Sequence, residues 1–202
     1  MRFFLEKLVL DLRVRLTFLL ERLLRLVSAK HVALGVPTYL AIVDHDELAT
    51  AKEQLNLSVA LIARYEPRKY ERLKRDLRGI LVHPFAAIPR AQYNRLTRYC
   101  ELTPSLVLTH DIVTIACAII HEGTHARFRR VRAHHPGRRL EVERACLSQE
   151  ILFLDQLPGM AQRAAEIRAV IENLRPDDFT DSARWSDMVG AWATAKELHN
   201  RA

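Results

Sequence analysis

The sequence predicts an α+β protein that is predominantly helical, with a small antiparallel sheet packed on one central helix. Three observations predict this class. Apolar residues recur at spacings of three and four through most of the 202 residues, as amphipathic helices require. A few short extended stretches lie together in the middle of the chain. One nearly all-apolar run leads directly into His121-Glu122-Gly123-Thr124-His125, an H-E-x-x-H motif.

The first 30 residues predict a long amphipathic helix. Charged residues interrupt every apolar run, so this segment is neither a signal peptide nor a membrane span. It holds seven basic and three acidic residues, which would suit an anchor at a membrane surface. Apolar residues on the opposite face favour enclosure against the core or a second copy of the chain. The leucines of its stripe are spaced by three and four: Leu5, Leu8, Leu12, Leu16, Leu19, Leu23 and Leu26.

The elements after this helix form a scaffold. Residues 33–43 contain Gly35 and Pro37 and predict a connector with a short extended stretch. Asp46 suits the start of a helix that ends near Tyr65, and Pro67 suits the first turn of the next. The predicted strands cover residues 80–83, 93–102 and 105–108. The predicted helices beyond the motif cover residues 138–156, 160–174 and 182–199.

The motif helix spans about residues 111–132. Thr109 or Asp111 can cap its start, and the arginines of its last turn suit the negative helix end. Its apolar first half predicts burial and its basic second half predicts exposure. The histidines fall where one gives way to the other, as the floor of a cleft requires. Gly123 would permit the close approach of a substrate or a packed strand.

The motif predicts a zinc site. Residues four apart lie on one face of a helix, so the imidazoles of His121 and His125 can converge on one ion. Zinc accepts nitrogen ligands and keeps a water in catalytic sites. Glu122 lies beside the first ligand, where its carboxylate can take a proton from that water. The expected cofactor is therefore Zn²⁺.

A third ligand is expected from the next helix, because position 131 is Val and no histidine follows six residues after His125. Glu143 is favoured, since it shares an apolar helix face with Glu150, and a buried carboxylate needs a partner. Glu150 itself remains a candidate, as do Glu141 and the pair His134 and His135. Cys146 lies on the same face as Glu143, where core packing is the favoured interpretation.

The segment from His121 to Arg127, followed by Glu143-Arg144-Ala145-Cys146 and Glu150, resembles zincin-type metallopeptidases of the gluzincin arrangement. It is most similar to small, poorly characterised bacterial proteins with an H-E-x-T-H-A-R core. The resemblance implies a zincin-like fold, two histidine ligands, a glutamate ligand and a glutamate base. It also implies that an edge strand holds the substrate backbone. Many gluzincins place an Asp where this chain has Leu147, so support for a ligand histidine must come from elsewhere.

Composition is consistent with a small globular protein, 49% hydrophobic and 27% charged. The expected organisation is an N-terminal helix over residues 1–32 and one metallohydrolase domain over residues 33–202. Three cysteines without a C-x-x-C spacing argue against a disulfide framework and for a cytoplasmic location, possible also at the periphery of a membrane. The net charge of +7 is dispersed, so nucleic-acid binding is not predicted.

The function expected from these features is that of a zinc-dependent peptidase acting on a peptide or protein substrate. The residue that would stabilise the oxyanion has five candidates: His83, Tyr93, Tyr99, His110 and His199. The alternative is a non-catalytic, metal-stabilised helical module, associated with a membrane through residues 1–30. Openness of the site separates the two, because a structural zinc site is closed by a fourth protein ligand.

Overall fold

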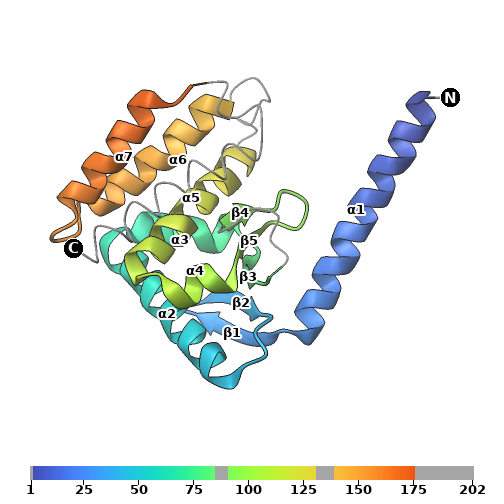
Figure 1. Ribbon diagram of the computed structural model, residues 1–202, viewed down its shortest axis with the longest axis horizontal. Coiled ribbons are helices and arrows are strands. Elements are labelled where there is room, and N and C mark those ends of the chain that lie inside the picture. The colour runs from blue at the N-terminus through green and yellow to red at the C-terminus, as the bar shows by residue number, and fades with distance from the viewer. Residues whose placement is uncertain (1, 85–90, 131–138, 176–202) are drawn as a thin grey trace.

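The computed structural model describes residues 2–84, 91–130 and 139–175. These residues form a mostly helical α+β fold around a small sheet (Figure 1). The helices are α1 (Arg2–Val27), α2 (His45–Tyr65), α3 (Pro67–Asp76), α4 (Pro104–Thr109), α5 (Ile112–Arg130), α6 (Arg139–Leu154) and α7 (Ala161–Asn173). The strands are β1 (Ala29–Ala33), β2 (Val36–Leu40), β3 (Gly79–Val82), β4 (Ala91–Tyr93) and β5 (Tyr99–Leu102).

The sheet is mixed, so the prediction of an antiparallel sheet is wrong. Its strand order is β1-β2-β3-β5-β4. The outer pairs β1–β2 and β4–β5 are antiparallel, whereas the inner pairs β2–β3 and β3–β5 are parallel. Helices α2 and α3 connect β2 to β3. A connection of this length lets the second strand run parallel to the first.

A β-hairpin follows α1. Its second strand, β2, is the short extended stretch predicted within residues 33–43, whereas β1 replaces the end of the helix predicted over residues 1–32. Strands β1 and β2 pair from Ala29 opposite Leu40 to Ala33 opposite Val36. The two-residue turn between them has positive φ at both positions, 44° at Leu34 and 81° at Gly35. This conformation matches the twist of the flanking strands. Leucine is unusual at a turn position with positive φ, so the residues Leu34 and Gly35 do not predict a hairpin turn.

The predicted strand over residues 105–108 is also wrong, because these residues belong to α4. Pro104 occupies the first turn, where its missing N–H costs nothing. The hydroxyl of Thr103 accepts a hydrogen bond from the amide of Leu106 at 3.3 Å and caps the helix. Leu106 and Val107 point into the core. The predicted helix over residues 182–199, with Trp185 and Trp192, lies outside the described residues.

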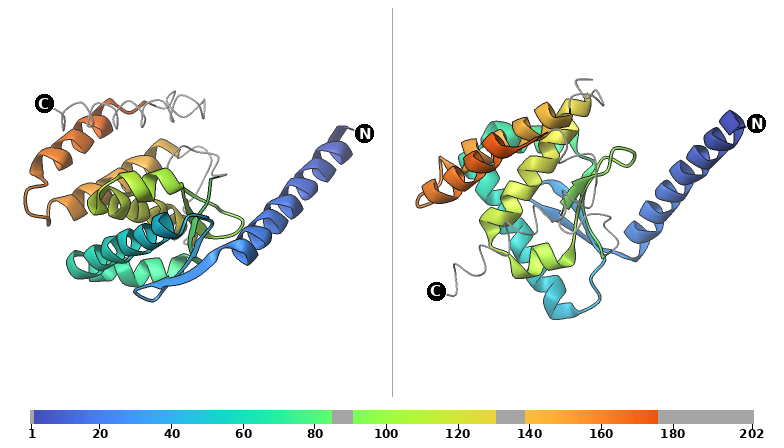
Figure 2. Two further views of the ribbon diagram at one scale, coloured as in Figure 1. Left: turned by 60° about the horizontal axis from the view of Figure 1, so that its bottom comes forward. Right: turned by 45° about the horizontal axis from the view of Figure 1, so that its top comes forward.

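The two faces of the sheet have different partners. Helices α2 and α5 contact strands of the sheet, α6 packs on α5, and α7 packs on α6 (Figures 1 and 2). On β3, Ile80 and Val82 join the core shared with these helices, whereas Leu81 joins a small second cluster. That second cluster includes Leu24 from the base of α1. Helices therefore cover one face, and the end of α1 contacts the other.

Helix α1 projects away from the rest of the described protein (Figures 1 and 2). Four leucines of its predicted stripe are exposed, by 53% at Leu16, 53% at Leu19, 50% at Leu23 and 72% at Leu26. The prediction that this chain's own core buries them is therefore wrong. The side chains of Leu5, Leu8 and Leu12 lie outside the described part of the helix. No helix among the described residues has the length and apolar content that a membrane span requires.

Candidate metal centre

Helix α5 places the two motif histidines side by side. Asp111 caps the helix, accepting hydrogen bonds from the amide of Thr114 at 2.8 Å and from its hydroxyl at 2.7 Å. The first half of the helix is buried in the core, as its apolar sequence predicted. The rings of His121 and His125 follow one turn apart, with centroids separated by 5.0 Å. Both side chains are mostly buried, with 13% and 17% of their surface exposed.

Gly123 lets another helix approach α5 on the face opposite these histidines. A Cβ atom at this position would lie 2.1 Å from Cδ2 of Leu73, far inside van der Waals contact. Leu73 belongs to α3 and is buried. The close neighbour of Gly123 is therefore a helix, not the strand or substrate that the sequence suggested.

Helix α6 brings Glu143 to both histidines. Its Oε2 atom lies 3.3 Å from Nε2 of His121 and 3.5 Å from Nε2 of His125. This buried oxygen accepts no aligned hydrogen bond from the described residues. Ligands held about 2.0–2.2 Å from a tetrahedral centre are about 3.3–3.6 Å apart. Both separations from Glu143 have this value, which is the spacing expected of two ligands that share one ion.

Cys146, one turn further along α6, belongs to the same cluster. His121, His125 and Cys146 each offer a donor atom within 4.8 Å of the other two. Glu143 lies outside that set of three, although its Oε2 is close to both imidazoles. This group of three could hold a metal ion. The thiol of Cys146 is fully buried, and the sequence interpretation of simple core packing missed its position beside the histidines.

Glu150 supports His121 from the other side of the ring. Its Oε1 atom lies 2.7 Å from Nδ1 of His121, which leaves Nε2 directed toward Glu143. A carboxylate on the second nitrogen of a ligand histidine fixes the orientation and tautomer of the ring. Glu150 therefore contacts Nδ1 of His121, whereas Nε2 of the same ring faces Glu143. It supplies the support that Leu147 cannot provide.

Electrostatics favours positive charge between α5 and α6. Burial lowers the pKa of His125, but Cys146 and Glu143 outweigh it and raise that pKa to about 10. Burial also lowers the pKa of His121, yet Cys146 and the nearby carboxylates raise it well above its usual value. Burial raises the pKa of Glu143, and the two histidines overcome this effect and hold it well below the usual range. Acidic groups with this effect also attract a metal cation.

Glu122 is buried beside this cluster. Burial raises the pKa of its carboxyl, the two histidines lower it, and Glu143 raises it again. A backbone hydrogen bond from Tyr93 also favours the ionised form. Tyr93 lies in β4, the edge strand that contacts α5. The carboxyl of Glu122 is therefore adjacent to the histidines and to the edge of the sheet, with a pKa above its ordinary value.

Arg95 is an exposed cation whose charge acts on Glu143 and Tyr93. Partial burial, Arg139 and Arg129 lower the pKa of its guanidinium, whereas Glu143 and Tyr93 raise it. It lies in the turn between β4 and β5. Asn94 shapes this turn by accepting hydrogen bonds from the amides of the second and third residues after it. Sequence reasoning missed Arg95, because no motif connects this turn with α6.

The five predicted oxyanion candidates are not brought together. His83 pairs with Glu101 at 3.6 Å between their side chains. Tyr99 lies in the second cluster, on the opposite face of the sheet from α5. His110 precedes α5, about 16 Å along the helix axis from His121 at 1.5 Å per residue. The backbone of Tyr93 reaches Glu122. His199 lies outside the described residues.

The remaining candidates for the third ligand are not part of the cluster. Glu141 is exposed on α6, on a different face from the two buried glutamates. His134 and His135 lie outside the described residues. The buried face of α6 thus carries Glu143, Cys146 and Glu150. They are three and four residues apart, the spacing that places side chains on one face of a helix.

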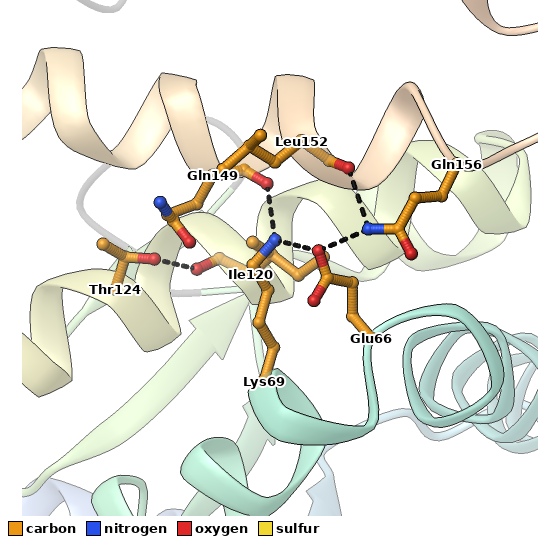
Figure 3. A network of polar contacts seen from close by, with 7 residues as sticks. All are labelled: Glu66, Lys69, Ile120, Thr124, Gln149, Leu152 and Gln156. Atoms are coloured by element: carbon orange, nitrogen blue, oxygen red, sulfur yellow. Dashed lines mark hydrogen bonds and ion pairs between the residues drawn. The ribbon is translucent and has the colours of Figure 1, made fainter.

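The position of α6 depends on contacts with α3. Nζ of Lys69 donates a hydrogen bond to the carbonyl oxygen of Gln149 at 3.2 Å, next to Glu150 in the chain (Figure 3). Glu66 pairs with Lys69 and also accepts a hydrogen bond from Gln156 at 2.7 Å. These contacts connect α6 and the residue Gln156 beyond its end to the start of α3.

No protein-family model, no curated protein and no solved structure matches this chain.

Proposed function

We propose that the chain is a zinc-dependent metallohydrolase, a peptidase with a zincin-like active site between α5 and α6. The observation that carries the proposal is the placement of Glu143 Oε2 at 3.3 and 3.5 Å from the Nε2 atoms of His121 and His125. These separations suit three ligands of one tetrahedral zinc ion. His121, His125 and Glu143 would hold the metal, as the resemblance to gluzincins implies.

The residues around the site have distinct roles in this proposal. Bound zinc would lower the pKa of a water molecule toward about 7 and polarise a carbonyl group. Glu122 would take the water proton on its carboxylate and pass it to the leaving amine. Its raised pKa suits that exchange better than an ordinary carboxylate would. Glu150 would keep Nε2 of His121 directed at the metal.

The substrate would be a peptide or protein chain. β4 is an edge strand beside α5, and an extended peptide can add to such an edge through main-chain hydrogen bonds. Arg95 would lie on the same side, near Glu143. Its guanidinium is the candidate that we favour for stabilising negative charge on the substrate.

A second candidate function is a metal-stabilised module without activity. The observation that favours it is Cys146, whose thiol lies within 4.8 Å of donor atoms on both histidines. Four protein ligands would close the site, whereas a catalytic site keeps a position for water. Both candidate functions require a bound metal. They differ in the fourth ligand, which is water in the peptidase and a protein side chain in the module without activity.

Metal analysis tests the proposal. Protein purified without added metal should carry close to one zinc per chain, measured by inductively coupled plasma mass spectrometry. His121→Ala and His125→Ala should lose tight binding, because each removes a nitrogen donor. His31→Ala is the matched control, since His31 bonds to Asn56 instead and should leave zinc content unchanged. Stoichiometric zinc in the His121→Ala/His125→Ala double variant would exclude this site.

A further inference from the structure

Cys146 is placed where a metal ligand would be, not where a packing residue alone would suffice. Glu143 and Cys146 lie three residues apart on α6, so their side chains leave the same face of the helix. Both are buried, with 7% and 0% of their surface exposed. The sulfur of Cys146 lies within 4.8 Å of a donor nitrogen on each of the two histidines. It therefore faces the same space as the imidazole nitrogens.

Charge also favours a thiolate at this position. Two neutral imidazoles and one carboxylate leave a divalent ion with one positive charge. A thiolate would cancel that charge, and an uncompensated charge is costly in a buried site. Zinc binds thiolate sulfur at about 2.3 Å and often combines it with histidine nitrogen. Cys117, which is equally buried and one turn before His121, lies outside the group of donors.

We propose that the Cys146 thiolate is a fourth metal donor, which competes with water for the coordination position that hydrolysis requires. This inference rests on the proposed zinc site and specifies its resting state. With His121, His125, Glu143 and Cys146 bound, the site is closed. It would become competent when water takes the place of the thiolate, which leaves as a thiol after accepting a proton from that water. Cys146 therefore regulates access to the metal, and it is not a reacting group.

Cobalt substitution measures this directly. The full chain is stripped of metal with a chelator and titrated with Co²⁺, which replaces zinc and is coloured. A cysteine ligand adds a sulfur-to-cobalt charge-transfer band in the near ultraviolet, separate from the visible bands of the bound ion. Wild type and Cys117→Ala should both show this band, saturating at one cobalt per chain. Cys146→Ala should bind cobalt and show the visible bands alone.

The outcomes separate the two proposals. One bound cobalt without the charge-transfer band in wild type would overturn the role of Cys146 and leave the zinc site standing. A band that persists in Cys146→Ala would also overturn it. No cobalt binding by wild type would overturn both proposals. If Cys146→Ala fails to fold, the variant Cys100→Ala/Cys117→Ala decides, because any charge-transfer band must then come from Cys146.

Discussion

Glu150 has a role that the spacing of the chain did not reveal. Seven residues after Glu143, it was one of several possible ligands. The structure places it on Nδ1 of His121 at 2.7 Å, while Glu143 lies near Nε2. The assignment of the two glutamates depends on how α6 is rotated and shifted against α5, which residue spacing on one helix cannot supply.

We expect Glu150→Ala to weaken zinc binding by about 10- to 100-fold, because removing the partner of a ligand histidine frees its ring to rotate. Glu150→Gln should lose less, since the amide oxygen can still accept the hydrogen bond. The dissociation constants can be measured by competition with a coloured chelator. Glu141→Ala, on the exposed side of the same helix, is the control. Equal affinity in Glu150→Ala and wild type would contradict the positioning role.

Glu122 should be needed for chemistry and not for metal. Its carboxyl is buried next to the histidines, and it is not one of the residues that we propose as metal ligands. Glu122→Gln keeps the size of the side chain and removes the base. We expect unchanged zinc content and melting temperature, with peptide hydrolysis reduced by about 10²-fold or more. Hydrolysis of a peptide library by purified protein is the measurement, and equal cleavage by the variant would rule out this mechanism.

The motif residues were predictable because one helix turn suffices to bring His121 and His125 together. Cys146 was not, since a buried cysteine on a helix more often packs in a core than binds a metal. The role that we propose for it depends on a contact between two helices. The same holds for Arg95, whose charge acts on Glu143 from a turn that is far away in the sequence.

At the scale of secondary-structure elements, the long helices and the strand β3 were predicted, whereas α4, β1 and the direction of the strands were not. The expected helix over residues 111–132 is α5, and that over residues 138–156 is α6. A short apolar run such as residues 105–108 has no periodicity that separates strand from helix. The start of a helix at this point is indicated by Thr103, which caps it, and by Pro104 in its first turn. Strand direction depends on the crossover through α2 and α3, which local sequence does not encode.

The contact between α3 and α5 gives a test of packing. Gly123→Ala should gain about 1 kcal/mol of helix propensity. The added Cβ would meet Cδ2 of Leu73 at 2.1 Å, and Leu73 is only 4% exposed, so it has little room to move. Overpacking of this kind costs about 1–3 kcal/mol. We expect a net loss in the free energy of unfolding, measured by urea denaturation.

The double variant Leu73→Ala/Gly123→Ala tests whether contact with Leu73 causes the loss of stability. Leu73→Ala alone should cost about 2–5 kcal/mol, because it leaves a cavity. In that background the methyl group of Gly123→Ala has space, so the same substitution should stabilise the protein. A loss of equal size in both backgrounds would mean that the two side chains do not interact.

At the scale of the whole molecule, α1 is an amphipathic helix whose exposed leucines, from Leu16 to Leu26, have no partner among the described residues. Leu19 is 53% exposed, whereas Leu24, on another face, is 8% exposed and contacts the sheet. The stripe of leucines includes Leu5, Leu12, Leu19 and Leu26 at intervals of seven residues. A seven-residue repeat is the pattern by which two helices wind around each other. A second copy of α1 is therefore the partner that we expect.

Two substitutions on α1 test whether its leucines serve the pairing of two chains or the stability of one chain. Leu19→Asp should convert a dimer into a monomer without lowering the melting temperature of the body, because the side chain of Leu19 is 53% exposed. Leu24→Asp should lower the melting temperature, since it buries an unpaired charge against the sheet. Mass from light scattering, thermal melting and flotation with anionic liposomes should be recorded for both variants. A wild type that is monomeric and floats with liposomes, and a Leu19→Asp variant that no longer floats, would show that the leucine face binds a membrane surface instead of a second copy.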